Sequence, residues 1–242
     1  MNRYANILAS VGICLGAVLS HSKSSNAQQT PVTAIDIALE PGATMVRHAE
    51  AVNARLRSVF PKGFALDAAH HPHITLLQRY VRTGELDKIY VAVGKVFIND
   101  DVASLKLKAN KYYYLTDPSL PGLGLSGIVV ETIPKLVKLQ QDLIDAVAPY
   151  TVKTGTAAAF VTTPASPEIN EATIRYIEVY VPEHSGEHLQ LHVTTGLAPV
   201  DYLKKMVAEP FEDFTFSPSG ASVFHLGNYG TAAAKLKELD VK

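Results

Sequence analysis

The sequence predicts an α+β protein, on three observations. Segments in which apolar residues alternate with polar ones come between segments in which apolar residues recur at helical spacing. The chain has 242 residues, of which 47% are hydrophobic and 19% charged, and this length is enough to bury a full core in one large domain or two closely packed lobes. Two strand-like segments, one in each half of the chain, share a His-x-Thr pattern.

A targeting signal precedes these elements. Arg3 supplies a positive start, residues 7–19 form an apolar stretch, and Ser25-Asn26-Ala27 provides small residues at a cleavage site. We therefore expect residues 1–27 to be a signal peptide and residues 28–242 to be a single exported domain, periplasmic or secreted, without membrane contact after cleavage. The alternative is an uncleaved anchor, although the apolar run is short for a membrane span.

Cysteine content and charge exclude several classes of function. Cys14 is the only cysteine and lies inside the signal segment, so the mature chain has no disulfide, thiolate nucleophile or Cys-ligated zinc. The formal net charge is −1, and removal of residues 1–27 leaves 20 basic and 23 acidic residues, a charge of −3. Without a run of Lys or Arg, we expect no binding to long nucleic acid.

The first elements are predicted to be strand, helix and strand. Apolar residues alternate with small or polar ones from Val32 to Leu39, which predicts a strand. A helical stripe then begins near Thr44 and ends at Pro61. A second strand is expected from Pro72 to Val81.

The middle of the chain repeats this alternation. A helical stripe begins after Thr83 and ends near Asn99, and alternation from Ser104 to Leu115 predicts a strand. A short strand over 125–130 leads into a helix over 132–147, in which Thr132 can act as the cap and Pro134 lies in the first turn.

The C-terminal part begins with a long loop, because residues 151–167 are rich in Thr, Ala, Gly and Pro, and we expect this loop to be exposed and flexible. The remaining segments alternate between the two periodicities. They predict a helix over 169–181, a strand over 189–195, a helix over 200–207, two strand pieces over 214–224 and a helix over 231–239.

The paired motifs are the sharpest feature of the sequence. In an extended strand, alternate side chains share a face, so His73 lies with Thr75 and His192 lies with Thr194. The residues between them are apolar and face the other way. Each segment therefore presents an imidazole and a hydroxyl on one side and a core face on the other.

The segments His71-Pro72-His73-Ile74-Thr75-Leu76-Leu77 and Leu189-Gln190-Leu191-His192-Val193-Thr194-Thr195 resemble the two-histidine phosphoesterase superfamily, which includes 2′-5′ RNA ligase-like and cyclic phosphodiesterase proteins. The resemblance extends from about Thr33 to the C-terminus. It implies two pseudo-symmetric lobes, each an antiparallel sheet with flanking helices, around a central cleft lined by both motifs. Thr195 stands where the family usually has an apolar residue.

The resemblance implies a phosphodiesterase acting on a 2′,3′-cyclic phosphate or a 2′-5′ linkage of a small nucleotide or RNA end. Its catalytic residues would be His73, Thr75, His192 and Thr194. One imidazole removes a proton from water, the other protonates the departing alkoxide, and the hydroxyls hydrogen-bond the phosphoryl oxygens. Which histidine is the base stays open. We expect no metal, no other cofactor and a monomeric protein.

Other residues of the sequence allow further roles. His71 shares the face of His73, so it is a candidate for substrate binding or a residue of the rim. Tyr114, with its two preceding tyrosines, can stack on a base, although packing within a strand explains these aromatic residues equally well.

Two alternatives to the enzyme stay open. One is an exported protein of the same fold that binds a nucleotide or phosphoester without turnover. The other is an exported metal-binding protein that uses His70, His71 and His73, although such closely spaced ligands usually need a distant donor as well.

Overall fold

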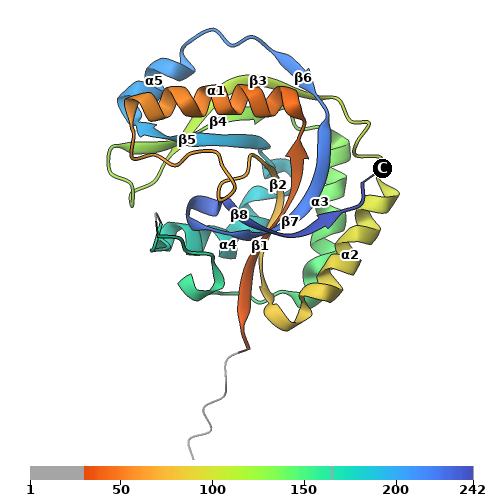
Figure 1. The fold of residues 1–242 in the computed structure, drawn as a ribbon. Coiled ribbons are helices and arrows are strands. Elements are labelled where there is room, and N and C mark those ends of the chain that lie inside the picture. Colours follow the sequence, from red (N-terminus) through yellow and green to blue (C-terminus); the bar gives the residue numbers. More distant parts are fainter. Residues whose placement is uncertain (1–29, 165, 242) are drawn as a thin grey trace, which may run out of the picture.

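The computed structural model describes residues 30–164 and 166–241, which form an α+β fold with two antiparallel sheets (Figure 1). The predicted signal segment, residues 1–27, lies outside the described residues. The strands are β1 (Val32–Pro41), β2 (Ile74–Arg82), β3 (Leu107–Thr116), β4 (Leu123–Val130), β5 (His192–Pro199), β6 (Phe214–Phe216), β7 (Pro218–Leu226) and β8 (Ala232–Leu239). The α-helices are α1 (Ala43–Val59), α2 (Leu86–Asn99), α3 (Pro134–Val147), α4 (Glu171–His184) and α5 (Val200–Val207).

The two sheets are built alike. Their strand orders are β2-β1-β7-β8 and β5-β4-β3-β6, and every neighbouring pair is antiparallel. The two strands that carry the His-x-Thr motifs, β2 and β5, are each the edge strand of their sheet and contact each other. The predicted α+β class with two antiparallel sheets is confirmed, and each sheet contributes one motif.

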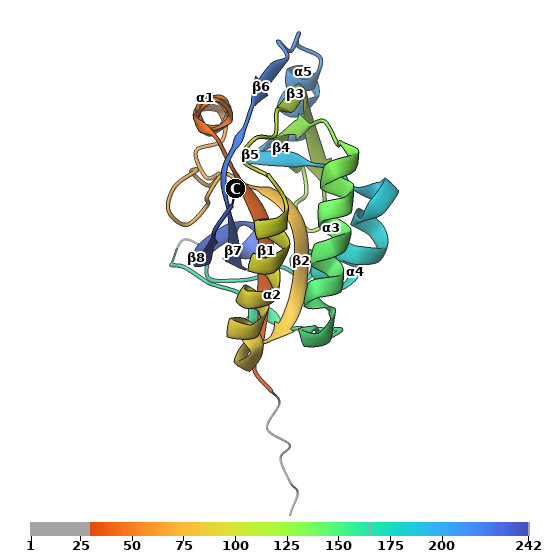
Figure 2. The same ribbon diagram turned by 90° about the vertical axis from the view of Figure 1, so that its right-hand side faces the viewer.

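The helices hold the two lobes together. Helix α1, which connects β1 to β2, contacts β5 of the other sheet, whereas α3 and α4, which lie between β4 and β5, contact β2 (Figures 1 and 2). A single apolar core includes Ile37 and Leu77 from one sheet and Ile128 and Val193 from the other. Separating the lobes would therefore expose apolar surface of both sheets to water.

The lobes do not correspond to the two halves of the chain. Strand β6 pairs with β3 in one sheet, and β7, which follows immediately, pairs with β1 in the other. The chain crosses between the sheets at Ser217. The N-terminal and C-terminal strands consequently share one sheet, and the first lobe is complete only when the end of the chain has returned to it.

The predicted C-terminal helix over 231–239 is wrong, because this segment is strand β8. Its alanines, lysines and leucines favour a helix by propensity, but β7 offers an open edge and β8 pairs with it from Ala232 to Leu239. Only these two end residues of β8 are buried, and Lys235 forms an ion pair with Glu40. Tertiary pairing thus outweighs local propensity, and the exposed charges suit a sheet edge.

Smaller differences concern the ends of α3 and α4. Thr132 does not cap α3, since its hydroxyl donates to the carbonyl of Leu189 (3.1 Å) and so ties the start of that helix to the segment before β5. Helix α4 begins at Glu171 behind its cap Asn170 and continues through Pro182 to His184, beyond the predicted end.

The segment 151–167 is anchored at its centre. Ala159 and Phe160 are buried, and Phe160 packs edge-to-face on Tyr80 of β2 with 5.8 Å between ring centroids. The backbone N–H of Val161 also donates to the carbonyl of Leu226 in β7 (2.8 Å). The prediction of an exposed loop is therefore wrong for Ala159 and Phe160, because their apolar side chains cover part of the first sheet.

None of the helices within residues 30–164 and 166–241 combines the length and apolar character that crossing a bilayer requires.

Gly42, between β1 and α1, is in close contact with Ser217 at the β6–β7 crossover. Its N–H donates to the carbonyl of Ser217 (2.9 Å), and a Cβ at this position would overlap that same oxygen. We expect Gly42→Ala to lower the free energy of unfolding by about 1–3 kcal/mol, measured by urea denaturation. Gly84→Ala is the matched control because a Cβ there meets nothing within 4 Å; equal stability of both variants would contradict the prediction.

Candidate active site

The two motifs meet at one cavity of about 260 Å³ between the edge strands. His73, Thr75, His192 and Thr194 all line it. His73 immediately precedes β2 and His192 is the first residue of β5, so each imidazole stands at the entrance of its strand. Each ring also makes the same local contact, from Nδ1 to the backbone carbonyl two residues earlier.

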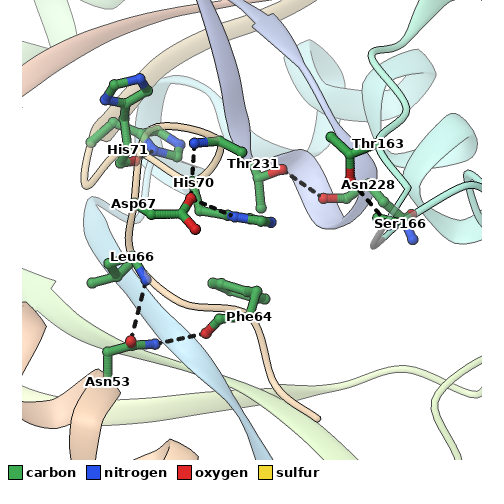
Figure 3. A network of polar contacts seen from close by, with 12 residues as sticks. Asn53, Phe64, Leu66, Asp67, His70, His71, Thr163, Ser166, Asn228 and Thr231 are labelled. Atoms are coloured by element: carbon green, nitrogen blue, oxygen red, sulfur yellow. Dashed lines mark hydrogen bonds and ion pairs between the residues drawn. The ribbon is translucent and has the colours of Figure 1, made fainter.

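The loop before the first motif is tied to the second motif through Asn53 of α1. The buried Asn53 side chain accepts from the N–H of Leu66 (3.2 Å) and donates to the carbonyl of Phe64 (3.0 Å) (Figure 3). The same amide donates to the carbonyl of Thr195 in β5 (2.8 Å). One side chain therefore links the approach to His73 with the strand that carries His192.

His73 is held between two acceptors. Its Nδ1–H donates to the carbonyl of His71 (2.7 Å), and its Nε2 lies 3.4 Å from Oδ2 of Asp36. Burial opposes the charged ring, but the hydrogen bond and negative charge of Asp36 and the carbonyl of His71 outweigh burial and raise the pKa of His73. An imidazole that faces an acceptor at both nitrogens is favoured as the imidazolium.

His192 lies in the opposite environment. Its Nδ1–H donates to the carbonyl of Gln190 (3.0 Å), which leaves the lone pair of Nε2 free in the neutral ring. Tyr113 packs on the ring edge-to-face with 4.9 Å between centroids. Burial lowers the pKa of His192 to about 4; the Gln190 carbonyl opposes this shift and the charge of His73 adds to it.

Asp36 is the residue of the site that the sequence analysis missed. It lies in the middle of β1, is fully buried, and its Oδ2 accepts from the hydroxyl of Thr75 (2.7 Å) and the amide of Gln78 (2.9 Å). Its other oxygen, Oδ1, has no partner among the described residues. The sequence did carry a signal for Asp36, since it is a carboxylate inside the apolar run of residues 34–39. A carboxylate is rarely buried without a polar partner, so its position indicated a polar site.

The two threonines differ in what their hydroxyls can do. Because Thr75 donates to Asp36, its proton is already engaged, and its lone pairs are what it presents to the cavity. Thr194 lies on β5 opposite Gly127, across from the ring of Tyr113. A Cβ on Gly127 would overlap that ring, so this glycine is what lets Tyr113 lie against His192.

The weaker substrate-binding candidates lie outside the main cavity. His71 forms a bridge to Ala232 and packs on Phe224 (5.6 Å between centroids), and its contribution to His73 comes from its carbonyl. Tyr114 packs against the apolar core. Tyr113 lines the cavity instead, since neighbouring residues of a strand point to opposite faces of the sheet. The sequence alone did not show which of these faces borders the cavity.

Thr195, the residue at which the second motif departs from the family it resembles, is fully buried. Its hydroxyl donates to Oγ of Ser126 in β4 (3.2 Å) and its carbonyl accepts from Asn53. The polar groups are paired, so the strand tolerates a threonine where an apolar residue is usual.

The three neighbouring histidines are directed to different partners. His70 stacks on Phe64 and contacts Asp67 (3.2 Å), while His73 points toward Asp36. Within the part of the chain that the structure describes, no group of three His, Cys, Asp or Glu side chains is placed to hold a metal ion.

The comparisons with known proteins identify a shared fold. The sequence matches no protein-family model and no curated protein. The structure is similar to the crystal structure of TT0787 from Thermus thermophilus, with a TM-score of 0.50 over 86% of this chain and 97% of that one. The two sequences are 15% identical, so the similarity concerns the fold.

Proposed function

We propose that this protein is a metal-independent phosphodiesterase of the two-histidine type, acting on a 2′,3′-cyclic phosphate or 2′-5′ linkage. The observation that carries the proposal is that two imidazoles line one cavity in different surroundings, with Asp36 beside His73 and Tyr113 packed on His192. His192 is favoured as the neutral ring and His73 as the imidazolium. A base and an acid that face one substrate are what hydrolysis of a phosphodiester requires.

In this mechanism His192 is the general base. Its free Nε2 takes a proton from a water molecule as the water oxygen bonds to phosphorus. The P–O bond to the departing ribose oxygen breaks, and Nε2 of His73 transfers its proton to that oxygen. Its contact to Asp36, at 3.4 Å, is longer than a strong charge-assisted hydrogen bond, so this proton is available for transfer. Proton exchange with solvent then restores both rings.

The polar groups around the phosphate complete the site. Thr194 lines the cavity next to Tyr113, and its hydroxyl can donate to a phosphoryl oxygen. Thr75 acts through Asp36, since its hydroxyl helps to hold the carboxylate that faces His73. The two threonines thus have different roles: Thr194 contacts the substrate and Thr75 is a positioning residue.

The test is turnover of nucleoside 2′,3′-cyclic phosphates and 2′-5′-linked dinucleotides by the full chain in excess chelator. We expect hydrolysis to the phosphomonoester at a rate that the chelator does not change. Nucleotide binding without turnover would favour the non-catalytic binding protein instead. Absence of both binding and turnover would show that the substrate class is wrong.

A further inference from the structure

Beyond the two imidazoles, the cavity has apolar and aromatic walls. Strand β3 contributes Tyr113 and Leu115, the β3–β4 connection contributes Leu120, and α4 contributes Tyr176 and Tyr180. These side chains offer ring faces and aliphatic surface to whatever is attached to the phosphate. They favour an uncharged planar or apolar group there.

Apart from His73, the charged groups at the cavity are negative. Asp117 lines it at the β3–β4 connection, and Asp36 lies buried beneath Thr75 and Gln78. The charge of Asp36 reaches the opposite wall, where it adds to the effect of burial and raises the pKa of Tyr176 and of Tyr180. Among the described residues that line the cavity, none is a Lys or an Arg.

The imidazolium of His73 is therefore the positive group that faces the substrate, and Asp36 already balances its charge. A phosphodiester brings one negative charge, which can lie against His73 and the hydroxyl of Thr194. A second phosphate on the same substrate would enter a negative region without a counter-charge, and the repulsion between these like charges is strongest at low ionic strength.

We propose that the site selects a phosphodiester with a single negative charge, whose attached group is uncharged and aromatic or apolar, and rejects substrates that carry a further phosphate nearby. This inference rests on the proposed function. It makes an unphosphorylated nucleoside cyclic phosphate a substrate and the end of a polyanionic RNA a poor one.

The test compares two substrates that undergo the same reaction: a nucleoside 2′,3′-cyclic phosphate and the same compound with a 5′-phosphate. We expect kcat/KM of the full chain to be lower by about tenfold or more for the 5′-phosphorylated compound at low ionic strength. The difference should narrow at high salt, because mobile ions screen the repulsion.

A charge-insertion variant tests the cause. Leu115 lines the cavity and is 49% exposed, so Leu115→Lys adds a cation at the rim. We expect this variant to raise kcat/KM several-fold for the 5′-phosphorylated substrate relative to the unphosphorylated one. Val91→Lys is the matched control, since Val91 lies on α2, is 59% exposed and does not line the cavity.

The outcomes separate the two proposals. Failure to cleave either compound, together with failure to cleave the 2′-5′-linked dinucleotides, would overturn the phosphodiesterase itself. Equal kcat/KM for both compounds would leave the phosphodiesterase standing and overturn the selection by charge. A difference that persists unchanged at high salt and in Leu115→Lys would show exclusion by shape, and the proposed charge mechanism would then be wrong.

Discussion

Alanine at His73 or at His192 is expected to lower kcat/KM by about 10²–10⁴-fold, because each change removes one of the two proposed proton-transfer groups. Both rings line the cavity at the entrances of edge strands, so their removal leaves the packed apolar side chains in place. We therefore expect both variants to stay folded, as measured by circular dichroism and thermal unfolding. The kinetic measurement is hydrolysis of a nucleoside 2′,3′-cyclic phosphate in excess chelator.

The double variant, with alanine at both His73 and His192, tests whether the two histidines act in the same reaction. Base and acid act in one reaction, so the double variant should be little slower than the slower single variant. His188→Ala is the control, since its side chain is 60% exposed and lies outside the cavity; this variant should keep full activity. Near-normal turnover in either single variant would remove that histidine from the mechanism.

The second large effect is expected for Asp36→Asn, through the pH dependence of kcat/KM. In the proposed mechanism, the active form needs His192 neutral and His73 protonated. In the wild type, activity should rise as pH increases through the His192 pKa of about 4. It should fall only as pH passes the raised pKa of His73, above the ordinary value of 6.5. The result is a broad maximum between these two pKa values.

Removal of the Asp36 charge leaves burial as the dominant influence on His73, and burial lowers the pKa of that ring. The alkaline limb of the profile should therefore move to lower pH in Asp36→Asn, with a large loss of activity near neutrality. The acidic limb should stay at or below its wild-type position, because Asp36 also favours protonation of His192 slightly.

Asp117→Asn provides the matched control for this experiment. Asp117 also lines the cavity, but its Oδ1 accepts from the N–H of Ser119 (2.7 Å), a contact local to its own loop. We expect the alkaline limb of this variant to coincide with that of the wild type. If Asp36→Asn also left the profile unchanged, Asp36 would have no part in holding the His73 proton.

Local sequence patterns were sufficient to predict the helices and strands whose apolar periodicity is strong. The stripes of α1, α2 and α3 and the alternation in β1 predicted helices and strands near their observed positions. The same rule of alternation put each histidine on one face with its threonine. Local reasoning failed for β8, because this segment of high helical propensity pairs with β7, and the edge that β7 offers exists only once β7 has paired with β1.

The sequence by itself determined that the protein has an α+β fold and that each of two strands offers an imidazole and a hydroxyl, since these features follow from residue type and short-range periodicity. The tertiary structure decided that both strands are sheet edges around one cavity, that Tyr113 rather than Tyr114 faces it, and that Asp36 stands beside only one histidine. The proposed division of the histidines into acid and base depends on this last difference. The pKa of a side chain depends on its burial and on its distance from other charges. The tertiary fold sets both, so the local sequence does not predict them.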